Sequence, residues 1–166
     1  MNILVTGGLG FIGSHTVVSL YEKGHQALII DDLSNASKEV LEKLETLTQS
    51  KIPYIEGNVT DFKLVENIFR NHPIDGVLHF AAFKAVGESV EKPILYYENN
   101  LNATLTIAKL ALEHKVNKFV FSSSCTVYGD QSSPFREEME LQPATNPYGA
   151  TKQMSEQIFL RRTDAS

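Results

Sequence analysis

Three side chains in the last third of the sequence could move a proton to or from a hydroxyl group. Tyr148 and Lys152 are four residues apart, a spacing that places both on one face of a helix. A free phenol loses its proton near pH ~10, and a neighbouring ammonium group favours the phenolate. Ser124 closes a run of three serines and could donate to or accept from a substrate hydroxyl beside such a base. The residues indicate acid–base chemistry at an alcohol, although an ordinary surface pair explains Tyr148 and Lys152 when they are considered alone.

A glycine-rich segment near the N-terminus could bind a pyrophosphate. Gly7, Gly10 and Gly13 are each separated by two residues, between a short apolar run and a helical pattern. Glycines allow a tight turn there, and the N–H groups that open the following helix would face the anion. The ordinary dinucleotide fingerprint has one residue between its first two glycines, so this spacing is a variant of it. The alternative is a strand-to-helix turn that binds nothing.

Two acids follow the second apolar run. A carboxylate at such a strand end can accept hydrogen bonds from the ribose of adenosine, and it would repel a 2′-phosphate. No arginine follows nearby to bind that phosphate. Asp31 therefore favours NAD over NADP as the cofactor, whereas Asp32 is equally well explained as a loop acid or a cap.

The end of the fourth apolar run offers another approach for a nucleotide. Ala81 and Ala82 are small enough to let the backbone come close to a ligand, and Lys84 could meet a ribose or a phosphate. The alternative for Lys84 is an exposed loop lysine. We interpret His79 as a packed strand residue rather than a catalyst, and His15 as a residue that packs beside the glycine loop.

The apolar pattern predicts the elements that would position these side chains. Short apolar runs alternate with longer helical patterns, which is typical of a parallel sheet with helices on both faces. Ligands of such open sheets bind beyond the carboxyl ends of the strands. We predict an α/β fold, a Rossmann-like doubly wound parallel sheet truncated after the Tyr-x-x-x-Lys helix. The predicted strands are 3–6, 27–30, 53–55, 76–80 and 118–122, and the predicted helices are 11–23, 38–48, 62–71, 94–114 and 148–162, with a long loop at 123–146.

Length and composition fit one globular domain. The chain has 166 residues, of which 42% are hydrophobic and 21% are charged. Its formal net charge of -5 does not favour a nucleic acid or an anionic membrane as a partner. The single cysteine, Cys125, permits no internal disulfide, and no segment resembles a signal peptide or a membrane span. We expect a cytoplasmic protein without a metal site.

In combination, these motifs resemble the UDP-glucose 4-epimerases, a family of extended short-chain dehydrogenases/reductases. The resemblance covers nearly all of residues 1–160. In this family NAD stays bound, a tyrosine takes the proton of the sugar 4-hydroxyl, and hydride leaves C4 and returns to its other face. The resemblance implies that the chain interconverts UDP-glucose and UDP-galactose with NAD. The stretches that carry it are Thr6–His15, Lys84–Ser89, Tyr96–Asn99, Ser122–Asp130 and Tyr148–Lys152.

The resemblance also implies roles for single residues. It makes Tyr148 the base and then the acid, and Ser124 the residue that aids proton transfer or orients the hydroxyl. Lys152 would favour the deprotonated tyrosine and hold the cofactor ribose. The family forms homodimers through the helices that correspond to 94–114 and 148–162. Besides these three catalytic residues, the implied cofactor contacts are Gly7, Gly10, Phe11, Ile12, Gly13, Asp31, Asn35, Asn58, Val59, Phe80, Ala81, Lys84 and Asn99.

Two departures from the family bear on this interpretation. Asn58 stands where the family usually has an aspartate that accepts from the adenine amino group, and an asparagine oxygen can still accept, but without charge. Family members also continue beyond the Tyr-x-x-x-Lys helix into further strands and a smaller C-terminal domain that grips the UDP. We expect residues 1–166 to be an incomplete NAD-binding Rossmann domain. In this interpretation the substrate domain is absent and residues 159–166 no longer resemble the family.

Two other functions stay open on the sequence. One is a sugar-nucleotide 4,6-dehydratase or decarboxylase on the same scaffold, in which an acidic residue commonly follows the strand-end serine or threonine. Ser124 is followed by Cys125-Thr126-Val127-Tyr128, which contains no acid and therefore favours the epimerase. The other is a nucleotide-binding module without catalysis, which the expected absence of the substrate domain favours.

Overall fold

The computed structural model describes residues 1–163, and only the backbone of residues 161–163. The chain forms two compact units. The first unit is Met1–Ala81 together with Leu105–Ser122, and the second is Ala82–Thr104 together with the residues from Ser123 on. All five strands of the described chain belong to the first unit, and the helix that carries Tyr148 belongs to the second.

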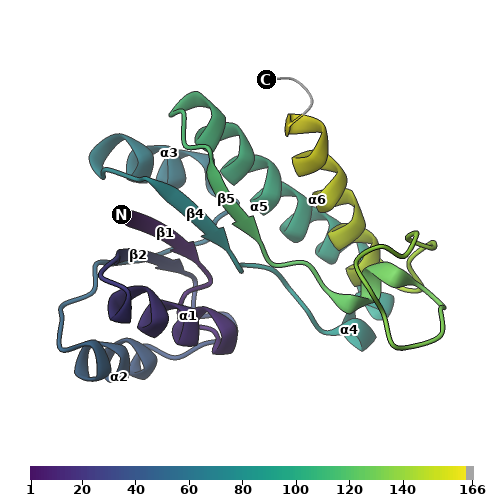
Figure 1. The fold of residues 1–166 in the computed structure, drawn as a ribbon, viewed down its shortest axis with the longest axis horizontal. Helices are drawn as coiled ribbons and strands as arrows, with labels where there is room; N and C mark the ends of the chain where they lie inside the picture. Colours follow the sequence, from purple (N-terminus) through teal and green to yellow (C-terminus); the bar gives the residue numbers. More distant parts are fainter. Residues whose placement is uncertain (164–166) are drawn as a thin grey trace. The chain divides into compact units, whose positions relative to one another are not determined.

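A parallel sheet forms the centre of the first unit (Figure 1). Its strand order is β3-β2-β1-β4-β5, so the strands are added outward in opposite directions on the two sides of β1. In open α/β sheets, ligands bind at the carboxyl ends of the strands where this direction reverses, which here is between β1 and β4. The strands are β1 Asn2–Thr6, β2 Gln26–Asp31, β3 Tyr54–Glu56, β4 Gly76–His79 and β5 Lys118–Phe121.

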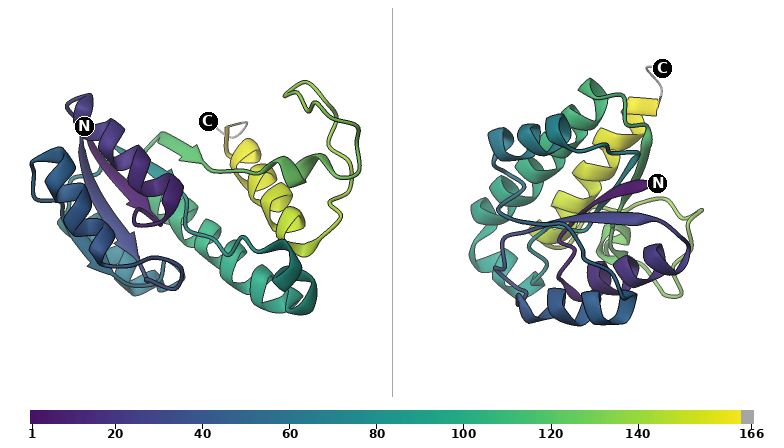
Figure 2. Two further views of the ribbon diagram at one scale, coloured as in Figure 1. Left: turned by 90° about the horizontal axis from the view of Figure 1, so that it is seen from below. Right: turned by 90° about the vertical axis from the view of Figure 1, so that its left-hand side faces the viewer.

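Helices cover both faces of this sheet, which explains why β1 and β2 bury almost every residue. Helices α1 Phe11–Glu22 and α2 Glu39–Thr48 lie on one face, where Val17 and Leu44 pack with Val5 and Ile29 (Figure 2). Helix α3 Phe62–Asn71 and the C-terminal part of α5 Pro93–Glu113 lie on the other face. These two helices are neighbours, since Lys109 Nζ lies 4.7 Å from the centroid of the Phe62 ring.

Local signals fix one end of each of two of these helices. The Asp61 side chain caps α3 by accepting a hydrogen bond from the Leu64 N–H at 3.1 Å. Gly24 follows α1 with a φ of +74°, a left-handed conformation that glycine adopts without steric cost.

The second unit consists of helices and a long connection. It contains α4 Val86–Glu91, the N-terminal part of α5, the short 3₁₀ helix η1 Cys125–Tyr128 and α6 Pro147–Thr163. Pro147 occupies the first turn of α6, where a missing N–H has no cost. No helix among the described residues combines the length and the apolar character that crossing a bilayer requires.

The predicted α/β architecture is confirmed, and three local predictions are corrected. The third strand is Tyr54–Glu56, one residue later than predicted. Helix α4 was not predicted, because its six residues are too few to display a helical period. The segment 123–146, predicted as a loop throughout, contains η1, which forms because the Ser124 side chain accepts from the Thr126 N–H.

Candidate active site

Two glycines of the loop after β1 allow the backbone to approach itself closely. Gly7 has a φ of +67°, and a Cβ there would lie 2.8 Å from the Ala81 nitrogen at the end of β4. A Cβ at Gly13 would collide with the Gly7 carbonyl oxygen and lie 2.8 Å from the Gly8 Cα. The turn is therefore compact enough for only glycine at both positions, as the sequence predicts.

The N-terminus of α1 is open to an anion. The first N–H groups of a helix have no partner within the helix, and together they form the positive end of its dipole. Gly10, the residue that precedes α1, has no side chain to cap them, and the first turn contains no acidic residue. Phe11 and Ile12 in that turn are 76% and 59% exposed. Helix ends of this kind commonly bind phosphate groups in proteins.

The Asp31 carboxylate connects the glycine loop to the end of β2. One oxygen accepts from the Leu9 N–H and the other from the Leu33 N–H, both at 3.0 Å. Burial raises the pKa of Asp31, and these two backbone hydrogen bonds oppose that rise. Each carboxylate oxygen can accept more than one hydrogen bond, so both can also receive ribose hydroxyls. Asp31 thus matches its predicted position at the strand end.

Asn58 bridges Asp32 and Thr60. Its amide nitrogen donates to Asp32 Oδ2 at 2.8 Å, and its oxygen accepts from the Thr60 N–H at 2.8 Å and from Thr60 Oγ1 at 2.7 Å. An adenine amino group would have to replace or share these donors to reach the Asn58 oxygen. Sequence reasoning missed this bridge, which gives Asp32 a neutral donor in place of a second carboxylate.

The remaining first-unit candidates differ in what they could offer a ligand. The side chain of Val59 is 4% exposed, so only its backbone could contribute, whereas Asn35 is exposed. Phe80 and Ala81 donate their N–H groups to Thr6, at 3.0 Å to its carbonyl and 3.2 Å to its hydroxyl oxygen.

The two histidines discussed above are structural. His79 is 2% exposed, its Nδ1 lies 2.7 Å from Thr6 Oγ1, and its ring stacks on Phe121. His15 Nδ1 lies 2.8 Å from the Phe11 carbonyl oxygen, and the two rings are in contact. Both match the packing roles predicted for them.

In the second unit, α6 buries Tyr148 and Lys152 side by side. They are 9% and 5% exposed, and Lys152 Nζ lies 5.9 Å from the centroid of the Tyr148 ring. Burial lowers the pKa of Lys152 to about 8, and the Glu156 charge opposes part of this effect. A buried pair of this kind is much less exposed than an ordinary surface pair, so the structure removes that alternative.

Ser124 lies at the start of η1 with its hydroxyl oxygen already engaged. Ser124 Oγ accepts from the Thr126 N–H at 3.3 Å and from Thr126 Oγ1 at 3.0 Å. A hydroxyl oxygen has two lone pairs, so the group that remains for a substrate is the Ser124 proton. The geometry therefore favours Ser124 as a donor rather than an acceptor.

A buried asparagine that sequence reasoning missed connects the Lys84 loop to α6. Asn100 accepts from the Phe83 N–H at 2.8 Å, and its amide nitrogen donates to the Phe83 carbonyl at 3.0 Å and to Thr151 Oγ1 at 3.1 Å. Thr151 in turn donates to the Tyr148 carbonyl at 2.7 Å. Lys84 follows Phe83 and is exposed, so Asn100 holds the backbone of the preceding residue while the Lys84 side chain is accessible.

Tyr96 supports the same loop from its other end. Its fully buried phenol accepts from the Ala85 N–H at 3.1 Å and donates to Glu88 Oε2 at 2.9 Å. Burial, followed by the Glu88 interaction, raises the pKa of Tyr96. Asn99, a predicted cofactor contact, is partly buried and donates to Asn100 Oδ1 at 3.1 Å.

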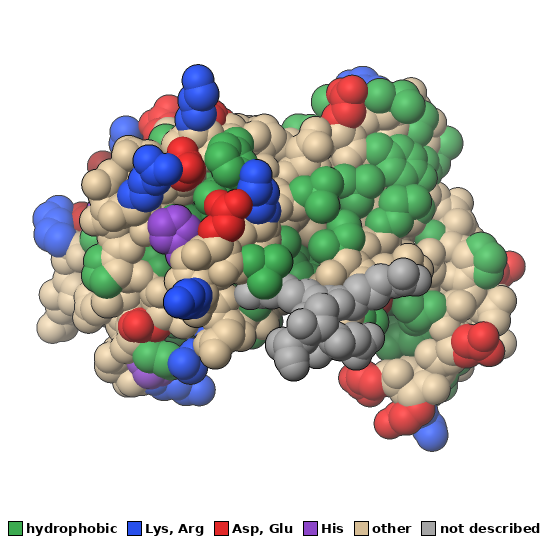
Figure 3. All heavy atoms as spheres, turned by 90° about the horizontal axis from the view of Figure 1, so that it is seen from above, with side chains coloured by type: hydrophobic (Ala, Val, Ile, Leu, Met, Phe, Trp, Pro, Cys, Tyr) green, Lys and Arg blue, Asp and Glu red, His purple; other side chains and the backbone are tan. Residues whose placement is uncertain are grey.

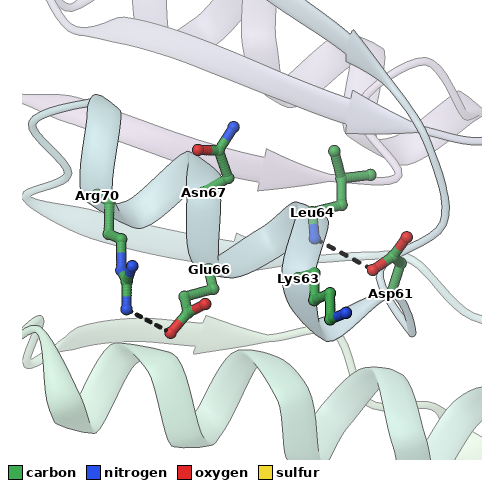
Figure 4. Close-up of a pocket in the computed structure, with 6 residues that line it drawn as sticks. All are labelled: Asp61, Lys63, Leu64, Glu66, Asn67 and Arg70. Carbon is green, nitrogen blue, oxygen red and sulfur yellow. Dashed lines mark hydrogen bonds and ion pairs between the residues drawn. The ribbon is translucent and has the colours of Figure 1, made fainter.

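A shallow depression on α3 offers no competing site. Its polar groups are largely paired, since Arg70 forms an ion pair with Glu66 at 2.8 Å and Asp61 caps the helix (Figure 4). Among the described residues, His, Cys, Asp and Glu side chains form no group that could hold a metal ion. The depression is lined by Asp61, Lys63, Leu64, Glu66, Asn67 and Arg70.

A family model of known proteins matches almost the whole sequence. It is described as the NAD dependent epimerase/dehydratase family, and it matches residues 3–166. The chain belongs to this family. The match includes the stretch from 159, so the expectation that these residues depart from the family is wrong; residues 164–166 lie outside the described structure.

Members of the NAD dependent epimerase/dehydratase family with close sequences are UDP-glucose 4-epimerases. That of Neisseria meningitidis serogroup A is 50% identical over 159 residues, which are 95% of this chain and 47% of the relative. That of Bacillus subtilis is 46% identical over 160 residues, 96% of this chain and 47% of the relative. The chain spans about half the length of the curated relatives it matches.

Solved structures of the family share the fold. The UDP-glucose 4-epimerase of Bifidobacterium longum, in complex with NAD+ and UDP, is 44% identical with a TM-score of 0.97 over 100% of this chain and 50% of that chain. The enzyme from Stenotrophomonas maltophila, with bound NAD and formylated UDP-arabinopyranose, is 37% identical with a TM-score of 0.94 over 99% of this chain and 49% of that chain. The predicted fold and family resemblance are confirmed.

Replacing Gly13 tests the compact turn. Gly13→Ala should lower the free energy of unfolding by about 2 kcal/mol, because its methyl group meets backbone atoms that cannot rotate away. Gly87→Ala is the control, since an added Cβ there meets nothing within 4 Å and alanine favours a helix. Urea unfolding of both variants is the measurement. Equal losses at the two glycines would contradict the steric account.

A second carboxylate at position 58 tests the bridge to Asp32. At pH 7, Asn58→Asp should destabilise the chain by about 1–2 kcal/mol more than Asn58→Ala, because it replaces a donor with a like charge. The excess should shrink toward pH 4, where one carboxyl group of the pair takes up a proton and can donate. Urea unfolding across this pH range measures it. An excess that does not change with pH would argue against charge repulsion.

Burial of Lys152 should make the free energy of unfolding depend on pH. Below pH 8 the folded chain must hold a buried ammonium group, whereas from pH 8 to 10.5 the folded state binds fewer protons than the unfolded state, so this contribution to stability rises with pH. Lys152→Met should therefore stabilise the chain at pH 7 by up to roughly 3 kcal/mol relative to its effect above pH 10. The exposed Lys43→Met variant is the control. A Lys152→Met effect that is equal at both pH values in urea unfolding would refute the account.

Proposed function

We propose that this chain is the NAD-binding and proton-transfer part of a UDP-glucose 4-epimerase, which interconverts UDP-glucose and UDP-galactose. The observation that carries the proposal is the buried Tyr148–Lys152 pair on α6. The 50% identity to the epimerase of Neisseria meningitidis supports the substrate assignment. The chain is an NAD-binding Rossmann domain in this proposal, and the grip on UDP comes from the portion of its relatives that it does not cover.

The first unit fits NAD. The compact Gly7–Gly13 turn leads into the uncapped start of α1, where a pyrophosphate would bind, and Asp31 would hold the ribose hydroxyls of adenosine with a carboxylate that repels a 2′-phosphate. Asn58, held by its hydrogen bond to Asp32, would contact the adenine. The proposed contacts of the first unit are Gly7, Gly10, Phe11, Ile12, Gly13, Asp31, Asn35, Asn58, Val59, Phe80 and Ala81.

The second unit supplies the proton chemistry. Tyr148 takes the proton of the sugar 4-hydroxyl as the ketone forms, and it returns that proton to the same oxygen when the alcohol is restored. Bound NAD supplies a reversible hydride acceptor for C4, so the proton and the hydride together account for the two hydrogens removed. Lys152 would hold the nicotinamide ribose and place its amine beside the Tyr148 ring, and Ser124 would donate its proton to the sugar oxygen. Lys84 and Asn99 complete the cofactor contacts.

The assembly and location belong to the same proposal. We assign a homodimer to the full-length enzyme, with contacts through α5 and α6. Each helix exposes apolar side chains, Leu105 and Leu112 on α5 and Met154 and Leu160 on α6, and exposed hydrophobic groups are visible on the face drawn in Figure 3. A cytoplasmic location agrees with a single cysteine and no possible internal disulfide.

A chimera tests the proposed function. This chain is joined to the part of the Bifidobacterium longum enzyme that it does not cover, a fusion that 44% identity and a TM-score of 0.97 make feasible. The chimera should convert UDP-galactose to UDP-glucose, and Tyr148→Phe should reduce turnover by about 10³-fold while NAD affinity changes little. The 166-residue chain alone should turn over no sugar nucleotide.

Three results would contradict the proposal. A folded chimera that binds UDP but does not bind NAD and does not convert a UDP-hexose would contradict the assignment of NAD as the cofactor. Full activity in Tyr148→Phe would remove the proton-transfer assignment, and Tyr97→Phe, a tyrosine outside the proposed site, is the matched control. Clear turnover by the 166-residue chain alone would contradict the proposal that UDP is held by the portion of the relatives that this chain does not cover.

A further inference from the structure

Helix α6 presents a second pair of residues directly beside the Tyr148–Lys152 pair. Gly149 and Gln153 are also four residues apart, and each follows a member of the first pair. One residue along a helix is a rotation of roughly 100°, so the second pair faces a different direction from the first. That direction is occupied by η1 and by the connection that leads into α6.

Gln153 hydrogen-bonds three backbone groups from two separate segments. Its amide nitrogen donates to the Val127 carbonyl at 2.7 Å and to the Gln142 carbonyl at 2.6 Å, and its oxygen accepts from the Ala144 N–H at 3.3 Å. The two amide hydrogens are thus donated to two carbonyl groups, one in η1 and one in the irregular connection before α6. A leucine or methionine of similar size would leave these groups without their protein partner.

Gly149 lets the same segments come close. A Cβ at Gly149 would lie 3.0 Å from the Thr126 carbonyl oxygen and 3.2 Å from the Ala144 Cβ. Helix α6 therefore contacts η1 at two successive turns. Gly149, which has no side chain, makes the first contact, and the amide of Gln153 makes the second. Both residues thus contact the segment that follows Ser124, Gly149 at Thr126 and Gln153 at Val127.

We propose that Gln153 is a positioning residue for Ser124: it fastens the segment Ser124–Tyr128 to the helix that carries Tyr148 and Lys152. This inference rests on the proposed function, because the roles of Ser124 and Tyr148 come from it. Ser124 caps η1, and Gln153 holds the Val127 carbonyl within η1, so the serine hydroxyl and α6 form one hydrogen-bonded unit. Gln153 itself touches no reacting atom.

Gln131 provides a comparison within the same connection. Its amide nitrogen donates to the Tyr128 carbonyl at 2.6 Å and to the Glu140 carbonyl at 2.9 Å, so it closes the loop on itself. These bonds stabilise the loop but involve no residue of α6. A Gln131→Leu variant therefore separates the order of the loop from its attachment to the helix.

Hydrogen exchange of the 166-residue chain tests the attachment directly. Gln153→Leu should accelerate amide exchange in the 124–129 peptide by about tenfold or more, because opening of η1 no longer breaks side-chain hydrogen bonds. Gln157→Leu, an exposed glutamine one turn further along α6, is the matched control and should leave this peptide unchanged. Unchanged exchange in Gln153→Leu would overturn the proposal, whatever the activity of the protein.

A double-mutant cycle in the chimera tests whether the attachment acts through Ser124. Gln153→Leu should lower kcat about tenfold with the KM for UDP-galactose and the affinity for NAD within about twofold, and Gln131→Leu should leave kcat unchanged. In a Ser124→Ala background the same substitution should have almost no further effect. Additive effects of Gln153→Leu and Ser124→Ala would show a general structural role and overturn the positioning role. An inactive wild-type chimera would instead count against the proposed function, and the exchange result would still decide the attachment.

Discussion

Removing backbone N–H and C=O groups from water costs free energy, unless another group replaces the hydrogen bonds that water made. Regular helices and strands provide that replacement themselves, whereas irregular segments need side chains to provide it. The second unit meets this constraint with amide side chains from helices. Asn100 satisfies both backbone groups of Phe83, and Gln153 satisfies groups of Val127, Gln142 and Ala144. An amide suits this purpose because it offers donors and an acceptor at once. The irregular segments that carry Lys84 and Ser124 are thereby fixed without a sheet to pair with.

The first unit meets the same constraint differently. There the sheet satisfies most of the backbone, and the irregular turns are short enough to be held by glycine contacts and by carboxylates. Asp31 holds Leu9 in the glycine loop, while Asp32 holds Ser34 and Asn58. A carboxylate used in this way keeps lone pairs for a ligand, so the groups that order the turns are also the groups that can bind ribose. The atoms that order these turns are therefore the same atoms to which the proposed function assigns the ribose.

Periodic features of the sequence predicted most of the fold and part of the site. The strand at 118–122 and the helix at 94–114 follow from apolar spacing alone, and Gly7 and Gly13 follow from the turn that their positions require. What the sequence could not reveal depends on residues distant along the chain. Nothing near Asn100 indicates that it bonds Phe83 and Thr151, and Gln153 resembles any other polar helix residue until its partners are seen. Amide side chains carry no charge signal and no period, so their role appears only when the chain is folded.

Lys152 illustrates a feature that stability alone does not explain. Burial lowers its pKa to about 8, so at neutral pH the folded chain holds an ammonium group at a cost. A methionine of similar length would fill a similar space without an ammonium group to desolvate. The neighbouring Tyr148 ring is also buried, and Lys152 Nζ lies 5.9 Å from its centroid, so α6 holds an ionisable amine beside a phenol. Ionisable groups with perturbed pKa values gather where proton chemistry occurs, so the buried Lys152 supports the role proposed for this pair.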